Sequence, residues 1–483
     1  MTDRLTGLRV EPKPIRGLLK VELFDAKTKK LVQKVEKENM VTNAIKNMLQ
    51  GYAATNQMGN IMPLYSVGLG GIMLFDAELE ASADNIHFPM SSHLVGYGTQ
   101  NVDTTNTLMG SKNSLESSVT LGAGGGSTTV WDFGTSQANG TIAAVALTSA
   151  SSPFKPLSRG CVATPCYYSG SDRERYNQNA VLAYEDGYVY IVRSISSSVE
   201  QSGTSYTRAY TMAIHKTYAP MHDYKVGDSA TNNMYTADEL HQTLTWTQST
   251  TGTSPDIKEV FAPCVDIDGD GSAYIIWSPG NATGNGTLYV TKIERNGLEW
   301  TANNTEILSL TGCPLKNNYG KIIQGSYLVM SYDGHSFYKI DSANPQDIKQ
   351  ITLPDGYYIH GYNVWQSLAK GGGLYFPVSI SRAVGEKTTT YYRYAILYPD
   401  GTIVLDGKDL ASLDYRVSTS NTKFGTTLSL DDGYAFGWQE GYYSPELYGF
   451  YMSNYLGTIA NLKTPIVKNA SQTLKITYSL VDA

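Results

Sequence analysis

The two ends of the chain carry the clearest alternation of apolar and polar residues. Residues 17–37 predict a β-hairpin, and residues 472–480 predict one amphipathic strand with Leu474, Ile476 and Tyr478 on its apolar face. A single strand is not stable alone, and the hairpin region has open sheet edges. We therefore expect the last strand to pair with the N-terminal region, which makes the middle of the chain an insertion between two parts of one domain.

One helix is predicted in this domain. Over residues 41–49 the apolar side chains recur at helical spacings, and Thr42 or Asn43 could cap the first turn. Residues 79–118 lack a sustained apolar period and are expected to be mostly loop. The expected end domain is therefore a β domain with one short helix, built from residues 1–149 plus 463–483.

The middle of the chain, residues 150–462, has almost no helical periodicity and many strand–turn–strand signals. Asp-Gly or Asn-Gly pairs recur between strand-like runs, for example at residues 186–187, 333–334, 400–401 and 432–433. Units spaced by about 40–60 residues are typical of propeller blades, and about five or six of them fit this region. The sequence thus predicts a mainly β protein with an inserted β-propeller-like domain. A β-sandwich or a prism of stacked hairpins is the alternative.

Charge and hydropathy narrow the class of protein. The 483 residues carry 37 Lys and Arg against 44 Asp and Glu, a formal charge of −7, and only 17% of residues are charged. This balance excludes a basic nucleic-acid binder, so no nucleic-acid partner is expected. No apolar run approaches the roughly 18 residues that a membrane-spanning helix needs, and the N-terminus lacks the apolar centre of a secretory signal. We expect a protein made in the cytoplasm, without membrane insertion.

Cysteine and histidine give no support for an enzyme. The four cysteines form no CxxC pair, and the seven histidines form no HxH or HExxH pair. A Gly-x-Ser-x-Gly elbow is also lacking in the sequence. We therefore expect reduced cysteines and no catalytic residues, although a glycan-cleaving propeller enzyme stays an alternative.

One acidic loop matches the beginning of a calcium site. Asp266, Asp268 and Asp270 occupy positions 1, 3 and 5, with Gly271 at position 6, as in an EF-hand loop. Position 12 is Trp277 instead of a bidentate Glu, so the EF-hand is incomplete. We favour a plain acidic hairpin turn and expect no cofactor, and a calcium ion held by this loop is the alternative.

Tyrosine is the anomaly of the composition. The chain holds 36 Tyr against 11 Phe and 6 Trp, and many of the tyrosines gather in the predicted insertion. Amphipathic rings with few rotamers make rigid contact area and stack on sugar faces. They also fill blade-to-blade and subunit interfaces, so both readings stay open. We favour the groups near predicted loops as glycan or receptor contacts: Tyr357, Tyr362, Trp365, Tyr442 and Tyr443.

Several stretches at the two ends resemble a known family. They are residues 38–49, residues 71–76 leading into 84–89, the run VWDFGTSQANGTI at 130–142, and residues 473–478. Together they resemble the attachment domain of tail-associated structural proteins in phages and prophages of Gram-positive bacteria. The middle of the chain has no such match.

The resemblance implies a division of labour within the chain. The end domain would dock on other virion proteins, while the inserted domain would face the host and bind a surface glycan or cell-wall polymer. It brings no catalytic residues, and it implies a location in the virion. Such appendages are commonly symmetric, so we expect a homo-oligomer, with a trimer as the favoured state. The leading hypothesis is therefore a tail fibre, tail tip or baseplate component. A head fibre or capsid decoration protein is the alternative within the class.

Overall fold

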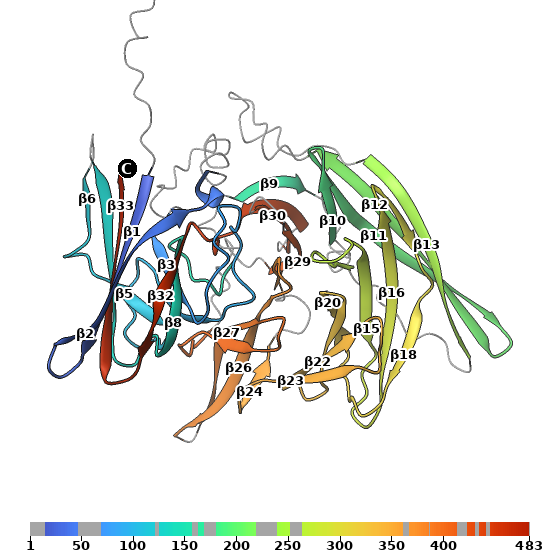
Figure 1. Cartoon of the computed structure of the whole chain (residues 1–483). Helices are drawn as coiled ribbons and strands as arrows, with labels where there is room; N and C mark the ends of the chain where they lie inside the picture. Colours follow the sequence, from blue (N-terminus) through green and yellow to red (C-terminus); the bar gives the residue numbers. More distant parts are fainter. Residues whose placement is uncertain are drawn as a thin grey trace, which may run out of the picture.

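The computed structural model forms two β units, which Figure 1 shows side by side. It describes residues 15–46, 69–120, 125–156, 163–168, 180–218, 239–251, 263–360, 367–385, 387–412, 423–429, 434–440 and 445–482. Within those residues, no helix is long and apolar enough to cross a bilayer.

The first unit is a closed barrel made from both ends of the chain. In the described residues its strands are paired in the order β33-β1-β2-β32-β8-β3-β4-β5-β7, and β7 pairs back to β33. Among the described barrel strands, the β4–β5 pair alone is parallel. A short strand, β6 (Ser118–Thr120), extends β7 at the rim. The barrel strands are β1 (Ile15–Asp25), β2 (Leu31–Val41), β3 (Gly71–Phe75), β4 (Leu94–Gly98), β5 (Met109–Lys112), β7 (Gly126–Phe133), β8 (Gly140–Thr148), β32 (Thr458–Lys468) and β33 (Gln472–Asp482).

The predicted pairing of the C-terminal strand is confirmed. β33 lies antiparallel to β1 along its whole length, from Ile15 opposite Asp482 to Asp25 opposite Gln472, and it pairs with β7 on its other edge. Ile476 is fully buried between Val21 and Trp131. The alternation seen in the sequence therefore fills the barrel interior with one face of each strand.

Three expectations for the end domain need correction. Residues 43–46 are helical, but Val41 belongs to β2, and the rest of the predicted helix lies outside the described residues. The Thr42 hydroxyl donates a hydrogen bond to the Leu456 carbonyl, and Nδ2 of Asn43 donates one to Oδ1 of Asp84. Residues 79–118, predicted as loop, contain β4 and β5. The predicted boundary at residue 463 falls inside β32, so the barrel takes in residues that were assigned to the insertion.

In the second unit, the described residues form five β-sheets, here called blades 1 to 5, arranged around a common centre as Figure 1 shows. Blade 1 comprises β10 (Ala180–Glu185), β11 (Tyr188–Ser202), β12 (Ser205–Tyr218) and β13 (Glu239–Thr251). Blade 2 comprises β14 (Cys264–Val265), β15 (Ala273–Ser278), β16 (Gly286–Asn296), β17 (Glu299–Ala302), β18 (Glu306–Leu310) and β19 (Asn318–Tyr319). Blade 3 comprises β20 (Lys321–Ile323), β21 (Ser326–Met330), β22 (Ser336–Asp341) and β23 (Ile348–Thr352).

The last two blades complete the ring. Blade 4 comprises β24 (Tyr357–Ile359), β25 (Ser367–Leu368), β26 (Leu374–Val384), β27 (Lys387–Leu397) and β28 (Ile403–Leu405). Blade 5 comprises β29 (Lys423–Ser429), β30 (Tyr434–Glu440) and β31 (Pro445–Tyr451), and its outer strand is β9 (Ala163–Tyr168), which comes from the start of the insertion. Because one blade joins the two ends of the inserted chain, the ring is closed. The fold is β-propeller-like, and neither the sandwich nor the prism describes it.

The predicted hairpins lie within these blades. β10 and β11 are joined by Asp186 and Gly187, which both have positive φ, as a tight two-residue hairpin requires. The pairs β21–β22, β27–β28 and β29–β30 are hairpins at the other predicted turns.

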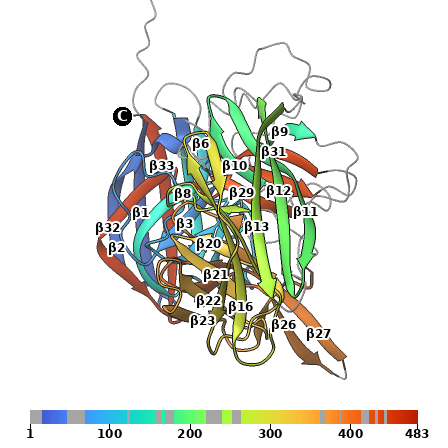
Figure 2. The same ribbon diagram turned by 90° about the vertical axis from the view of Figure 1, so that its right-hand side faces the viewer.

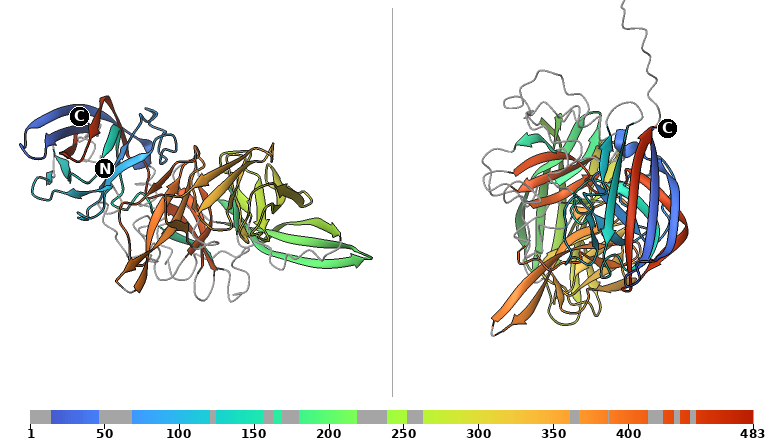
Figure 3. Two further views of the ribbon diagram at one scale, coloured as in Figure 1. Left: turned by 90° about the horizontal axis from the view of Figure 1, so that it is seen from below. Right: turned by 90° about the vertical axis from the view of Figure 1, so that its left-hand side faces the viewer.

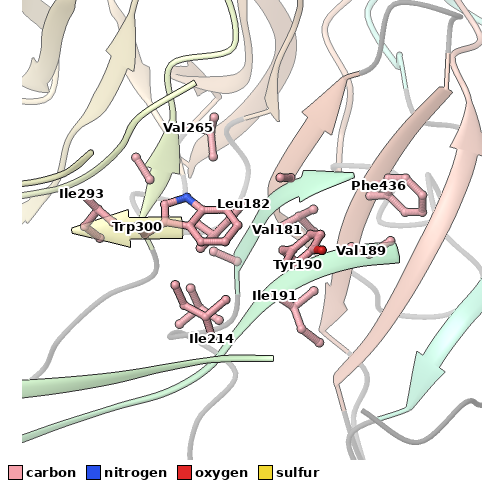
Figure 4. Packing of buried hydrophobic residues seen from close by; sticks show 14 of the residues in the cluster. Val181, Leu182, Val189, Tyr190, Ile191, Ile214, Val265, Ile293, Trp300 and Phe436 are labelled. Atoms are coloured by element: carbon pink, nitrogen blue, oxygen red, sulfur yellow. The ribbon is translucent and has the colours of Figure 1, made fainter. Parts of the chain in front are cut away.

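The blades are held together by apolar side chains that pack between sheets. Figure 4 shows one such cluster, in which Tyr190 and Ile191 of blade 1 lie among Val265 and Trp300 of blade 2 and Phe436 of blade 5. β10 has a run of four buried residues because both of its faces are covered. Each blade therefore depends on its neighbours for a core.

An apolar and aromatic contact fixes the barrel to blade 4. Phe88 of the barrel unit packs against Tyr375 and Tyr398 of blade 4, with ring centroids 6.2 and 6.4 Å away. Tyr398 is 1% exposed, and its hydroxyl oxygen accepts a hydrogen bond from the Leu94 amide at 3.0 Å. Buried aromatic side chains thus join the two units.

Polar groups surround this contact. Tyr97 and Asn106 of the barrel unit donate hydrogen bonds to Oδ1 of Asp406, at 3.0 and 2.9 Å. Desolvation raises the pKa of the Asp406 carboxyl. The His93 ring lies between carboxylate oxygens of Asp76 and Asp400, at 2.9 and 3.0 Å. Charged and neutral polar groups of both units therefore fix the orientation of the propeller on the barrel.

The two connections between the units also run next to each other. The Ser453 carbonyl accepts hydrogen bonds from the hydroxyls of Thr148 and Ser149. The Gly457 amide donates to the Leu147 carbonyl at 2.7 Å. The chain thus leaves the barrel and returns to it at one place.

Two hairpins reach beyond their sheets. The β11–β12 hairpin, drawn in green at the right end of the left-hand view in Figure 3, points away from the barrel. The β26–β27 hairpin extends from blade 4, as Figure 2 shows, and its outer residues are exposed.

Candidate functional site

Of the five predicted aromatic contacts, only Tyr357 can be placed. Tyr362, Trp365, Tyr442 and Tyr443 lie outside the described residues. Tyr357 begins β24 and is 7% exposed, because its ring packs in the apolar cluster between blades 3 and 4.

The prediction for Tyr357 is therefore corrected, since a buried ring offers no face to a sugar. The hydroxyl of Tyr357 nevertheless contacts a charged cluster, where it donates a hydrogen bond to Oδ1 of Asp409 at 3.3 Å. Asp409 also accepts a hydrogen bond from Nε of Arg393 at 2.7 Å and one from Nη1 of Arg382. One carboxylate thus holds two guanidinium groups and a phenol. We call Tyr357, Arg382, Tyr391, Arg393 and Asp409 the arginine cluster.

Strand register explains how the cluster forms. In the β26–β27 hairpin Ile380 lies opposite Tyr391, and Ile380 also lies opposite Tyr357 of β24. These residues share one face of blade 4, and Arg393 is two positions along from Tyr391 on that face. Arg382 has the same relation to Ile380. The alternation of the strands therefore gathers two arginines and two tyrosines from positions up to 36 apart in the sequence.

Aromatic rings support both guanidinium groups. The Arg393 guanidinium carbon lies 5.4 Å from the centre of the Tyr357 ring, and that of Arg382 lies 5.9 Å from the centre of the Tyr391 ring. Cation–π contacts of this kind favour a fixed position for the charge. The Arg382 side chain is 47% exposed, whereas those of Arg393 and Asp409 are 22% and 17% exposed. The cluster thus has a fixed base and an accessible outer arginine.

The electrostatics of the cluster favour the ionised carboxylate. Desolvation alone would raise the pKa of Asp409, but the hydrogen bond from Arg393 and the charges of Arg393 and Arg382 hold this pKa below its ordinary value. Desolvation raises the pKa of Tyr357, so its hydroxyl keeps its proton. With one negative and two positive charges, the cluster has a net positive charge in a protein of net charge −7.

The acidic loop does not gather its carboxylates around a common point. Oδ2 of Asp266 accepts a hydrogen bond from the Gly325 amide of blade 3 at 3.0 Å. Oδ1 of Asp268 accepts one from the Gly371 amide of blade 4 at 2.8 Å. Asp270 turns back to the Ser272 amide and lies 3.6 Å from Nζ of Lys292. Among the described residues, no three His, Cys, Asp or Glu side chains are arranged to hold a metal ion.

The loop instead connects three blades. It extends from blade 2, and two of its carboxylates bind backbone amides of the next two blades around the ring. Desolvation raises the pKa of both Asp266 and Asp268. The glycines of the motif serve this turn, because a Cβ at residue 269 would lie 2.6 Å from Oδ2 of Asp266. The Asp-Gly-Asp-Gly pattern therefore has a structural explanation without an ion.

Sequence reasoning missed Arg382, Arg393 and Asp409 as parts of a site. A usable signal existed for the two arginines, because a hairpin turning at Gly385 brings Arg382 close to Tyr391 and Arg393. Asp409 follows the next strand, and its position depends on a bridge between Tyr392 and Leu410 that leaves no pattern in the sequence.

Comparisons with known proteins show only distant likeness. No protein-family model matches the sequence, and no curated protein has a significant match to it. A luciferin-regenerating enzyme shares 10% identity over 62% of this chain and 97% of its own, with a TM-score of 0.29. YCF48, in a structure with a bound D1 peptide, shares 12% identity over 60% of this chain and 96% of its own, with a TM-score of 0.24. A Trypanosoma rangeli sialidase, in a complex with sialic acid, shares 10% identity over 78% of this chain and 56% of its own, with a TM-score of 0.22. At these identities, the activities of those proteins are not attributed to this chain.

Proposed function

We propose that this chain is a structural protein of a phage tail that docks on the particle through its barrel and binds the host surface through its propeller. The observation that carries the proposal is the insertion of a complete propeller into a barrel that both chain ends close. This architecture separates a mount from a presented domain. The family resemblance of the end segments supports the same division.

The connection between the units suits an attachment protein. A buried aromatic contact around Phe88 and Tyr398, with the polar groups of Asp406 and His93 beside it, holds the propeller in one orientation. A rigid mount lets several copies present their sites together. If the chain assembles as a symmetric trimer, weak single contacts would add up to avidity.

The arginine cluster supports binding more than catalysis. It contains one carboxylate, Asp409, which two arginines keep ionised. Glycoside hydrolysis ordinarily uses two carboxyl groups about 5–10 Å apart, one of which must hold a proton. A fixed positive cluster on a projecting hairpin is better suited to contacting a ligand without cleaving it.

Two measurements test the proposed function. Fluorescently labelled full-length protein should bind host cells or their isolated walls, and an antibody against the protein should label the tail of the phage particle. Label on the head would favour the alternative of a head fibre or capsid decoration protein. Absence of label on intact particles would contradict a role in the virion.

A separate measurement, the release of reducing sugar, tests the alternative of a glycan-cleaving enzyme. Incubation of the protein with host wall polymer should release no reducing sugar while the protein stays bound. Release of sugar that depends on the protein would replace the adhesin with a glycan-cleaving enzyme.

A further inference from the structure

We propose that the arginine cluster binds an anionic group of a surface polymer, a phosphodiester or a carboxylate carried by a polysaccharide. This inference rests on the proposed function, since it names the chemistry that the host-facing domain would recognise. It also commits to the charge of the ligand, which the sequence leaves open between neutral glycans and other cell-wall polymers.

The number of hydrogen-bond donors supports this chemistry. A guanidinium group has five N–H donors in a planar arrangement that matches carboxylate and phosphate oxygens. The hydrogen bonds to Asp409 use Nη1 of Arg382 and Nε of Arg393. Asp409 thereby neutralises only one of the two charges, and among the described residues no further hydrogen bond engages the other N–H groups of the two arginines, so these groups are available to a ligand.

The position of Arg382 gives the ligand access. Its side chain is 47% exposed on the β26–β27 hairpin, which extends beyond blade 4. Arg393 and Asp409 lie deeper, with side chains that are 22% and 17% exposed. An anion that approaches Arg382 from solvent would therefore meet an arginine whose position Asp409 and Tyr391 already restrict. Such preorganisation lowers the entropic cost of binding.

Asp409 separates anion binding from a purely structural role. Its hydrogen bonds fix the two arginines, but its negative charge weakens the binding of an anion. Its negative charge repels an incoming anion, and it also competes for the guanidinium donors. Changes of the arginines and of Asp409 should consequently shift anion affinity in opposite directions. A cluster that only stabilises blade 4 would not produce this reversal.

The test compares Arg382→Gln, Arg393→Gln and Asp409→Asn in the full-length protein. The matched control is Arg295→Gln, because Arg295 forms a comparable ion pair with Glu185 at 2.8 Å, with a side chain that is 25% exposed. Binding is measured by calorimetry with three polymers: poly(glycerol phosphate), polygalacturonate and neutral dextran. Circular dichroism checks that each variant is folded. Arg382→Gln is the variant least expected to disturb folding, because Arg382 is the most exposed of the three residues.

We expect each arginine variant to bind the anionic polymers about tenfold or more weakly, as for the loss of one charged hydrogen bond. Asp409→Asn should bind them more tightly, and Arg295→Gln should match the unchanged protein. Affinity should fall as salt is added. Preference for poly(glycerol phosphate) would identify a phosphodiester ligand, and preference for polygalacturonate a carboxylate ligand.

Equal binding of dextran, or arginine variants that bind as well as the unchanged protein, would overturn the inference. So would a loss of affinity in folded Asp409→Asn. Each of these results leaves the proposed function intact if the protein still binds host walls and labels the tail. Failure of wall binding by the unchanged protein would instead contradict the proposed function itself.

Discussion

The barrel and the propeller achieve closure in different ways. In the barrel, a continuous ladder of backbone hydrogen bonds returns from β7 to β33, so every strand of the circle has two neighbours. In the propeller, five separate sheets are held by side chains between their faces, and a strand from the beginning of the insertion, β9, completes the last sheet. Closure of the barrel therefore depends on the backbone pairing of individual strands, whereas closure of the propeller depends on side-chain packing between its sheets.

The largest effect is expected from Ile476→Asp in the strand that closes the barrel. Ile476 is fully buried between β1 and β7, so the variant places a charge without a partner in the barrel core. We expect a loss of about 4 kcal/mol or more in the free energy of unfolding. Limited proteolysis with mass spectrometry should find the first cuts in residues 15–148 or 458–482, the two segments that build the barrel. First cuts within the blades would contradict the comparison, and Thr473→Asp, on the outer face of the same strand, is the control.

Trp300→Ala should weaken the propeller instead. Trp300 is 1% exposed and packs in the cluster shared by blades 1, 2 and 5. The cavity should cost about 3–5 kcal/mol, with early cleavage confined to the blades. Equal protection of the propeller in the variant and the unchanged protein would show that packing between blades does not hold the ring.

A smaller effect is expected where the two units meet. Tyr398→Phe removes the hydroxyl that accepts the buried Leu94 amide, which should cost about 1–3 kcal/mol. Tyr332→Phe is the matched control, because Tyr332 is 48% exposed. If both variants melt at the temperature of the unchanged protein, the polar contact adds nothing to the attachment of the propeller.

Asp406→Asn tests the same junction through pH. Desolvation raises the pKa of Asp406, so just above the carboxyl's ordinary pKa the folded protein holds a proton that the unfolded chain has released. The free energy of unfolding should therefore fall as the pH rises through that range. The variant should lose this dependence, and its free energy of unfolding at neutral pH should exceed that of the unchanged protein. Denaturant titrations between pH 3.5 and 7 measure this dependence, and Asp347→Asn, which changes an exposed residue, is the control.

The smallest effect is expected from removing calcium. Amides of blades 3 and 4 already satisfy Asp266 and Asp268. A chelator should therefore leave the melting temperature within experimental error. If the chelator lowers the melting temperature and added calcium restores it, the loop binds calcium and the prediction is wrong.

Much of the fold could be predicted because its signals are local. The alternation of Leu474, Ile476 and Tyr478 reports a strand with one buried face, and paired Asp-Gly turns report hairpins. β4 escaped prediction because small residues interrupt its apolar pattern. Gly98 is one of them, and a Cβ there would lie 2.5 Å from Cδ1 of Trp131. Packing against the Trp131 ring therefore requires glycine at this position, although glycine interrupts the apolar pattern by which the strand could have been predicted.

The candidate site was less predictable because it depends on contacts between distant segments. The sequence could mark Tyr357 as part of a tyrosine group, but burial between blades 3 and 4 removed its ring from the surface. Asp409 can be placed beside Arg382 and Arg393 only when the strand register and the bridge between Tyr392 and Leu410 are known. The acidic loop shows the reverse case, in which a familiar spacing of carboxylates serves as a brace.

The adjacent connections near Thr148 and Ser453 have a consequence for how such a protein could change. Because the chain leaves and rejoins the barrel at hydrogen-bonded positions, the strands of the mount are complete on either side of the insertion. A different domain whose own ends lie equally close could be exchanged at this point without altering the barrel. Under the proposed function, the same barrel could then carry different recognition domains as a replaceable cassette, and the range of surfaces recognised would change by recombination instead of gradual substitution.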